Sequence, residues 1–179
     1  MKTTQILIAG FGGQGILFSG KFIAYKGLIE ELQVSWLPSY GPEMRGGTAN
    51  CNVILSDSPV GSPIITTPDV LIAMNLPSLQ KYVNTVAKGG QIYVDSSLID
   101  VKVERDDVEV FYIPATQLAK ENGIGTLANM IIVGHLLENH PELSFDGAFE
   151  VVEKLVPAKK AALKELNVKA LTIGKDYKN

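Results

Sequence analysis

The sequence predicts a single α/β domain, residues 1–179, whose mostly parallel sheet carries helices on both faces. Short apolar runs alternate with segments of helical periodicity along the chain. A glycine-rich joint connects the first apolar run to the first helical segment. No low-complexity tract or long linker divides the 179 residues, and a chain of this length buries its own core as one domain.

The first elements follow from local patterning. Residues 5–9 form an apolar run bounded by glycine, which predicts a buried strand. From Ile16 onward, small and apolar side chains recur at helical spacing, and Gly27 is expected to end that helix. Residues 33–37 predict a second strand. Residues 5–37 therefore have the length of a right-handed crossover between two parallel strands.

The rest of the chain continues the alternation. Residues 38–47 hold two prolines and three glycines and predict a loop. Residues 48–55 predict an antiparallel strand, because no helix precedes them. Further strands are expected at residues 69–74, 91–95 and 108–113, and helices at residues 79–87, 115–121, 127–138, 146–156 and 158–166. After residue 166 we expect a short strand or a frayed tail. The whole pattern is Rossmann-like.

Composition excludes several classes of protein. The formal net charge is -3, and no stripe of basic residues is interleaved with aromatics, so nucleic acid is not an expected ligand. No apolar run approaches the roughly 18 residues of a membrane span, and the first residues lack a signal-peptide pattern, so we expect no membrane association and a cytoplasmic location. The mean hydropathy of +0.16 suggests apolar surface that packs against a partner.

Sulfur and imidazole groups are scarce. Cys51 is the single cysteine, so this chain forms no intrachain disulfide and no thiolate metal site, and any iron–sulfur cluster belongs to another polypeptide. The two histidines do not assemble a catalytic triad. We expect His135 to be a core or interface residue. His140 precedes Pro141 at a helix end, where a positive charge would suit the helix dipole. No catalytic residue and no metal ligand is assigned.

The first functional motif is Gly10–Gly15, a G-x-G-x-x-G placed between a predicted strand and a predicted helix. Glycines allow close backbone approach, and free amides at a helix start attract phosphate or carboxylate. A dinucleotide site also needs an acidic residue about 20 positions later, where this chain has Leu37–Tyr40. NADP binding stays open as an alternative, because Arg45 could bind the 2′-phosphate of that dinucleotide. In a second alternative the loop only joins strand to helix.

The second motif is Ser39–Thr48, which begins at the end of the second predicted strand. Ligand crevices of open α/β sheets lie at such strand ends. Arg45 is followed by two glycines and offers a planar guanidinium to a carboxylate or phosphate. The alternative interpretation is a glycine-rich surface turn whose charges are solvated.

Together the two motifs resemble the gamma subunit of 2-oxoacid:ferredoxin oxidoreductases, which include the pyruvate and ketoisovalerate enzymes. Asn129-Met130 adds a weaker third match. The resemblance spans nearly the whole chain. It implies a complex that uses thiamine diphosphate, magnesium and coenzyme A to oxidise a 2-oxoacid, and that passes electrons through iron–sulfur clusters to ferredoxin. It also implies alpha, beta and delta-type partner subunits, which hold the thiamine cofactor and the clusters, and it implies that this chain alone binds no cofactor.

The resemblance assigns cofactor-binding candidates in both motifs. These are Gly12, Gly13, Gln14, Gly15, Tyr40, Gly41, Glu43, Arg45, Gly46 and Gly47. Whether they contact coenzyme A or partner subunits stays open at this point, as does the identity of the 2-oxoacid. The chain alone is expected to be inactive. The rival hypotheses are a free-standing NADP-binding oxidoreductase and a purely structural assembly module.

Overall fold

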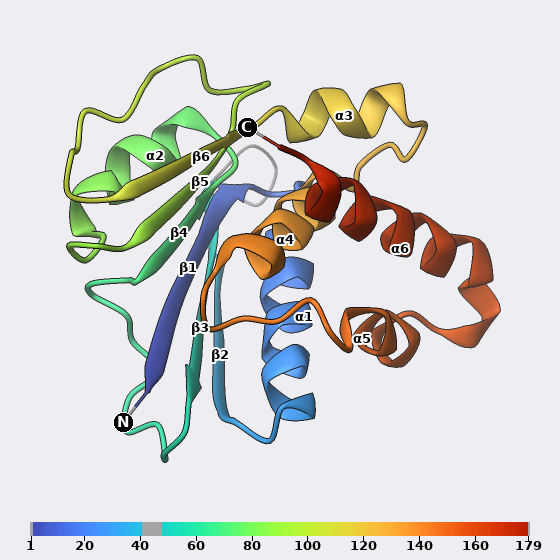
Figure 1. Cartoon of the computed structure of the whole chain (residues 1–179), viewed down its shortest axis with the longest axis horizontal. Helices are drawn as coiled ribbons and strands as arrows, with labels where there is room; N and C mark the ends of the chain where they lie inside the picture. Colours follow the sequence, from blue (N-terminus) through green and yellow to red (C-terminus); the bar gives the residue numbers. More distant parts are fainter. Residues whose placement is uncertain (1, 41–47, 179) are drawn as a thin grey trace.

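The computed structural model describes residues 2–40 and 48–178. Within these ranges a six-stranded sheet has the order β2-β3-β1-β4-β5-β6 (Figure 1). The strands are β1 (Thr3–Phe11), β2 (Gln33–Tyr40), β3 (Thr48–Ser56), β4 (Val70–Ala73), β5 (Gln91–Asp95) and β6 (Glu109–Ile113). The helices are α1 (Ile16–Ile29), α2 (Leu76–Tyr82), α3 (Ala115–Glu121), α4 (Ala128–Asn139), α5 (Ala148–Leu155) and α6 (Ala161–Asp176), with short 3₁₀ turns at Val83–Thr85 and Ala158–Lys160. The predicted α/β class is confirmed.

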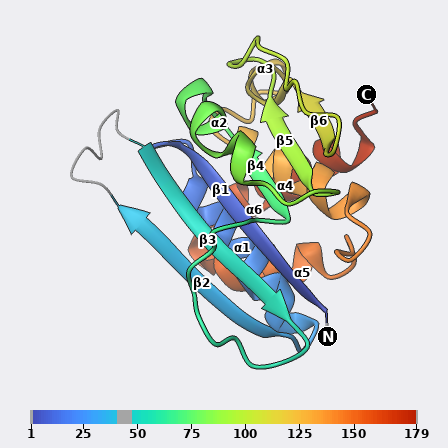
Figure 2. The ribbon, with the colours of Figure 1, turned by 90° about the vertical axis from the view of Figure 1, so that its left-hand side faces the viewer.

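The sheet is parallel on one side and antiparallel on the other. Strands β1, β4, β5 and β6 pair in parallel, whereas β3 pairs antiparallel with both β1 and β2 (Figure 2). Strands β1 and β2 therefore point the same way, as the predicted crossover requires. They are not neighbours in the sheet, however, whereas a simple crossover would place them side by side. The predicted antiparallel strand β3 occupies the position between them.

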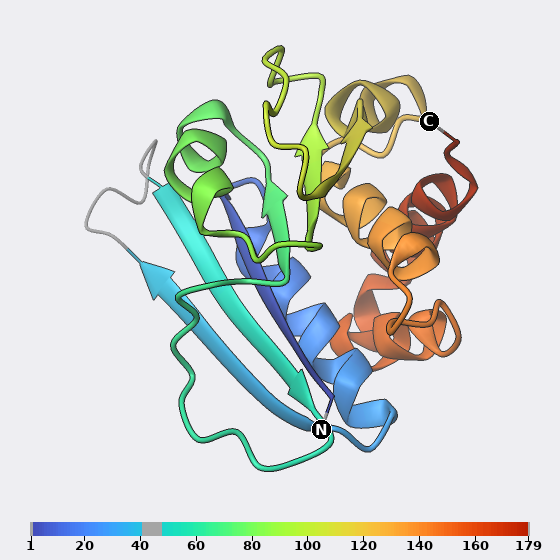
Figure 3. The same cartoon turned by 60° about the vertical axis from the view of Figure 1, so that its left-hand side comes forward.

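Helices cover the two faces unequally. Helices α1, α3, α4, α5 and α6 contribute to the larger core, on the face that carries Ile8 and Tyr93 (Figures 1 and 3). On the opposite face, α2 packs through Leu79 on Leu71 and Ile92 in a smaller core. The prediction of helices on both faces is confirmed. The antiparallel side carries helices on the larger-core face, and Figure 2 looks onto its other face.

Helix α1 does not end at Gly27, as the sequence suggested, but continues to Ile29. Gly27 lies on the buried face, where an added Cβ would contact Leu55 at 2.5 Å, so this glycine serves close packing on the sheet. The left-handed residue that turns the chain is Glu31, with φ of 60°, and Leu32 N–H donates to the Gly27 carbonyl at 3.0 Å. A non-glycine residue therefore ends the helix.

The chain after residue 166 is not a strand or a tail, because α6 extends from Ala161 to Asp176. It packs along α4, as the red and orange helices of Figure 1 show. Gly134 of α4 and Gly174 of α6 lie at the contact, where an added Cβ on either glycine would overlap the backbone of the other helix. The helix is stabilised by this close contact, which local periodicity does not reveal.

Candidate functional site

The Gly10–Gly15 motif lies at the carboxyl edge of the parallel strands. Strand β1 ends at Phe11, and α1 begins at Ile16 directly after the turn. In the register of the sheet, Phe11 pairs with Thr48 and Tyr40 pairs with Ala49. The end of β1, the end of β2 and the start of β3 therefore meet at one edge, as the two-motif hypothesis requires.

Gln14 fixes the conformation of this turn through its side-chain amide. Its Oε1 accepts from the Phe11 backbone N–H at 2.6 Å, and its Nε2 donates to the Met74 carbonyl at 2.9 Å. Met74 follows β4, and its own N–H donates to Ala9 of β1 at 2.9 Å. Gln14 thus links the carboxyl ends of two parallel strands. The side chain serves the turn itself rather than reaching outward for a ligand.

Asn129 fixes the turn from the opposite direction. Its Nδ2 donates to the Gly15 carbonyl at 3.2 Å and to Ser19 Oγ at 3.0 Å, and its side chain is buried. Gly15 has φ of 76°, and a Cβ there would lie 2.7 Å from the Asn129 Cγ atom. The carboxamide therefore occupies the space that a larger residue at position 15 would need. Sequence reasoning gave the Asn129-Met130 pair little weight, and an asparagine in an otherwise apolar helix was the available signal.

The first turn of α1 is electrostatically positive. Gly15 caps the helix in a left-handed conformation without a side-chain hydrogen bond, and no acidic residue lies in the first turn. The first N–H groups of a helix lack intrahelical partners, and the helix dipole adds partial positive charge there. Gly13 is exposed, with φ of 96°, and none of the described residues lies within 4 Å of the position a Cβ would take. No described side chain therefore blocks an anion from this backbone.

The second motif falls largely outside the described residues. Gly41, Glu43, Arg45, Gly46 and Gly47 belong to that part of the chain. Tyr40 is described as the last residue of β2. The ends of β2 and β3 nevertheless locate both attachment points of the segment beside Phe11.

The sheet order argues against dinucleotide binding. In a dinucleotide-binding fold, the ribose-binding acid ends the strand next to the first strand. Here β3 separates β2 from β1. Because neighbouring strands lie about 4.8 Å apart, the end of β2 is roughly one strand spacing too far from the glycine turn. The strand also contains no acidic residue.

The histidines and the cysteine are packing residues. His135 is buried, its ring packs edge-on against Tyr93, Phe111 and Tyr177, and its Nδ1 lies 3.0 Å from the Gly174 carbonyl. Burial lowers the pKa of His135. The core interpretation of His135 is confirmed.

Burial lowers the pKa of His140, and its Nδ1 accepts a hydrogen bond from the Glu142 N–H at 3.2 Å; both disfavour the positive charge that would suit the helix dipole there. Cys51 is fully buried against α1, and burial raises the pKa of its thiol to about 12. A thiol in this state is a poor nucleophile. Among the described residues, no three histidine, cysteine or acidic side chains gather to hold a metal ion.

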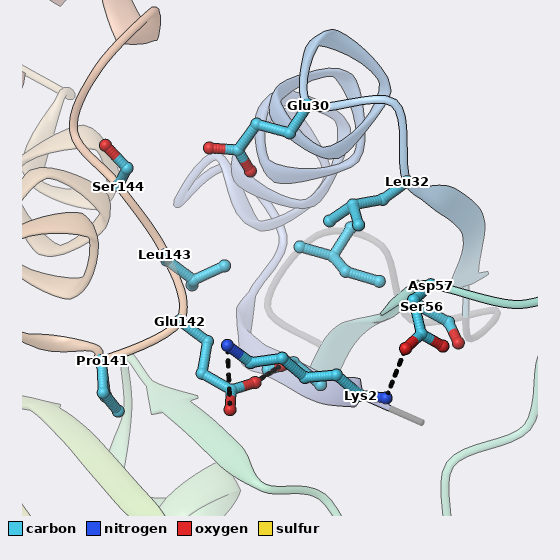
Figure 4. A pocket seen from close by; sticks show the side chains of 11 residues that line it. Lys2, Glu30, Leu32, Ser56, Asp57, Pro141, Glu142, Leu143 and Ser144 are labelled. Atoms are coloured by element: carbon cyan, nitrogen blue, oxygen red, sulfur yellow. Dashed lines mark hydrogen bonds and ion pairs between the residues drawn. The ribbon is translucent and has the colours of Figure 1, made fainter.

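A cavity of about 390 Å³ lies at the opposite, amino-terminal edge of the parallel strands (Figure 4). Its charged groups already have partners. Lys2 Nζ lies 3.4 Å from Glu142, the Lys2 backbone N–H donates to Asp57 at 2.9 Å, and Glu30 pairs with the buried Lys26. The described lining offers no uncommitted charge to a ligand. The glycine turn is therefore the better candidate site.

The fold and the turn define a class of protein: an α/β domain that presents a glycine-rich helix start at the carboxyl edge of its parallel strands. Residues 5–177 match the family described as pyruvate ferredoxin/flavodoxin oxidoreductase. The chain belongs to this family, which confirms the resemblance carried by the two glycine motifs. None of the helices in the described ranges combines the length and apolarity needed to cross a membrane.

Individual relatives agree with this assignment. The ketoisovalerate oxidoreductase subunit VorA of Methanothermobacter marburgensis is 35% identical over 176 residues, covering 98% of this chain but 37% of VorA. The gamma subunit of a keto/oxoacid ferredoxin oxidoreductase from Geobacter sulfurreducens superposes with a TM-score of 0.80 at 30% identity, covering 97% and 96% of the two chains. A third structure is a 2-oxoglutarate:ferredoxin oxidoreductase from Magnetococcus marinus with 2-oxoglutarate, coenzyme A and succinyl-CoA bound. It superposes with a TM-score of 0.87 at 28% identity, and the match covers 98% of this chain and 31% of the other.

Proposed function

We propose that this chain is the gamma-type component of a thiamine-diphosphate-dependent 2-oxoacid:ferredoxin oxidoreductase. Family membership over residues 5–177 is the observation that carries the proposal. The likeness to a gamma subunit over nearly the full length of both chains supports it. Thiamine diphosphate, magnesium and iron–sulfur clusters, held by alpha, beta and delta-type subunits, supply the decarboxylation and the electron transfer to ferredoxin. Purified alone, the chain should be colourless and should not turn over a 2-oxoacid.

The role of this chain within the complex is to present an anion cradle. Gly12 and Gly13 are exposed, and Gln14 fixes the turn against β4. The N–H groups at the start of α1 then face an anionic part of coenzyme A, whose phosphates suit a helix start. Arg45 of the second motif carries a planar guanidinium, which suits the same phosphates.

A matched pair of variants at Gly13 tests the cradle. Gly13→Asp and Gly13→Asn place side chains of nearly equal size at the same left-handed residue, so their backbone strain is similar, and they differ by one negative charge. In the assembled enzyme, the apparent KM for coenzyme A should rise about tenfold more in the Asp variant, which corresponds to about 1.4 kcal/mol. Equal KM values in the two variants would show that no anion binds there.

Arg45 provides a second test in the same complex. Arg45→Ala should raise the apparent KM for coenzyme A or weaken assembly, because one planar cation is removed from the second motif. Arg45→Lys keeps the charge without the bidentate geometry and serves as the control. An unchanged KM together with unchanged assembly in the Ala variant would remove Arg45 from the site.

A further inference from the structure

Strands β2 and β3 form a part of the surface that is almost without charge. In residues 33–40 and 48–68, Asp57 is the only charged residue, although 20% of the whole chain is charged. Depletion of charge is the compositional mark of the centre of protein–protein interfaces. The sequence pattern therefore singles out this region before any partner is considered.

The register shows which of these side chains face away from the helices. Cys51, Val53 and Leu55 of β3 belong to the larger core beside α1. Because side chains alternate along a strand, Asn50 and Asn52 face the opposite side. They pair there with Ser39 and Leu37 of β2.

We call Ser35, Leu37, Ser39, Asn50 and Asn52 the β2–β3 surface (Figure 2). Leu37 is 37% exposed within it. A groove of about 170 Å³ lies between Asn52 and the segment that runs through Ile65 and Pro68. Trp36, 39% exposed, pairs with Val53 and lies on the other face of β2, beside Gly20 of α1.

The outer edge of β2 carries no charged side chain, and Pro38 is the one protective residue within the strand. In the described sheet β2 is the outermost strand on its side, and Pro38 is its one residue that cannot donate a backbone hydrogen bond. Proteins commonly protect such edges with lysine or other charged side chains. The opposite edge strand, β6, follows that rule at its first residue, the exposed Glu109. The contrast between the two edges indicates that β2 is covered by a partner.

We infer that the β2–β3 surface and the β2 edge bind the part of the oxidoreductase that accompanies this domain in its longer relatives, an inference that rests on the proposed function. In VorA and in the Magnetococcus chain, this domain corresponds to 37% and 31% of the polypeptide. In the Geobacter protein it corresponds to 96%. The same domain therefore adjoins a larger protein region in some relatives and forms a subunit by itself in another.

The position of the β2–β3 surface favours that occupant over a second copy of this chain. Phe11, the last residue of β1, pairs with Thr48, so the surface runs directly to the rim of the glycine turn. A region that holds the cofactors must approach that turn and would cover the neighbouring strands as it does so. Serine and asparagine side chains call for a partner face that is uncharged and offers hydrogen bonds beside apolar groups.

Two charge-introducing variants test the inference in the native complex, whose larger subunit is first identified by mass spectrometry of what copurifies with the wild-type chain. Ser39→Lys adds a charge at an exposed strand position without removing core contacts, and Leu37→Lys removes an exposed apolar side chain. Leu98→Lys is the matched control, because Leu98 is 48% exposed and follows β5, on the far side of the sheet order. Circular dichroism and thermal unfolding of each isolated chain verify that it is folded.

We expect each β2 variant to weaken association with the larger subunit at least about tenfold, with the Leu98 variant close to wild type. Equal binding by folded wild-type, Ser39→Lys and Leu37→Lys chains would overturn the inference and leave the proposed function standing. A wild-type chain that copurifies with no larger oxidoreductase subunit would overturn both. A self-associating wild-type chain that both lysines make monomeric, with binding to the larger subunit unchanged, would assign the surface to a second copy and overturn the inference.

Discussion

Two groups of glycines in this protein lie in opposite environments. At the α4–α6 contact, a Cβ on Gly134 or Gly174 would overlap the backbone of the facing helix. At Gly13, in the turn between β1 and α1, no atom of residues 2–40 or 48–178 lies within 4 Å of the position a Cβ would take. Glycine is required inside the protein at the helix contact, whereas at Gly13 the protein leaves the space open.

The difference separates glycines that serve the fold from those available for function. Backbone-to-backbone packing explains Gly134 and Gly174 completely. Gly13 adopts a left-handed conformation, for which glycine is favoured, but its exposure leaves room for an outside group to approach the backbone. Gly15 is intermediate, because both its φ of 76° and the neighbouring Asn129 require a residue without a side chain.

The largest expected effect is on the helix contact. Gly174→Ala should lower the free energy of unfolding by about 3 kcal/mol, because the added methyl group meets the Ile131 carbonyl, and backbone cannot move aside as a flexible side chain can. Urea unfolding of the isolated chain measures this. Gly61→Ala is the control, since Gly61 has open space and an ordinary φ, and it should be neutral or slightly stabilising. Comparable losses in both variants would contradict the packing argument.

Asn129 connects the two regions, since it lies in α4 and bonds to the turn. Asn129→Ala should lower the free energy of unfolding by about 2 kcal/mol. The substitution leaves a small cavity, and it removes the amide that donates to the Gly15 carbonyl and to Ser19 Oγ. Hydrogen exchange should rise at residues 11–19 more than in α6. A rise confined to α4 and α6 would mean that Asn129 stabilises only the helix contact.

Local patterns predicted most of the elements, but neither the order of the strands nor the end of the chain. The position of β3 between β1 and β2 depends on pairing between segments about 40 residues apart in sequence, to which periodicity is insensitive. Helix α6 continues beyond Leu166 because Gly174 allows contact with α4, although glycine is a poor helix former. Local propensity was overridden there by tertiary packing.

For the candidate site, too, local patterns predicted the sequence elements but not the long-range contacts that join them. The glycine turn and its placement between strand and helix follow from spacing alone, and the register brings the attachment points of the second motif beside it. The hydrogen bonds of Gln14 to Met74, and of Asn129 to Gly15, join residues 60 and 114 positions apart. No local pattern contains such information.

Acid should weaken the α4–α6 contact through protonation of the buried His135. Burial lowers the pKa of His135 below its usual 6.5, with the nearby Lys178 adding to the effect and the Gly174 carbonyl and Glu138 opposing it. The unfolded chain therefore binds the proton first, and stability should fall as the pH drops below about 6.5, by no more than about 1.4 kcal/mol per pH unit for one proton.

Urea unfolding between pH 8 and pH 5 measures this slope. The pKa of His140 is lowered in the same direction, so His140→Asn is needed as a separate variant. His135→Gln should remove the part of the pH dependence of the unfolding free energy that is due to His135. His140→Asn should remove the part that is due to His140. A His135→Gln profile as steep as that of wild type would show that His135 does not take part.

The smallest expected effect completes the comparison between the two groups of glycines. Gly13→Ala should lower the free energy of unfolding by about 1 kcal/mol, because its cost is confined to a left-handed φ of 96° and no neighbouring atom is displaced. Thermal or urea unfolding of the isolated chain should therefore separate it clearly from Gly174→Ala. A loss at Gly13 as large as that at Gly174 would mean that the turn, like the helix contact, requires its glycine for the fold itself. The open space at Gly13 would then no longer favour a ligand.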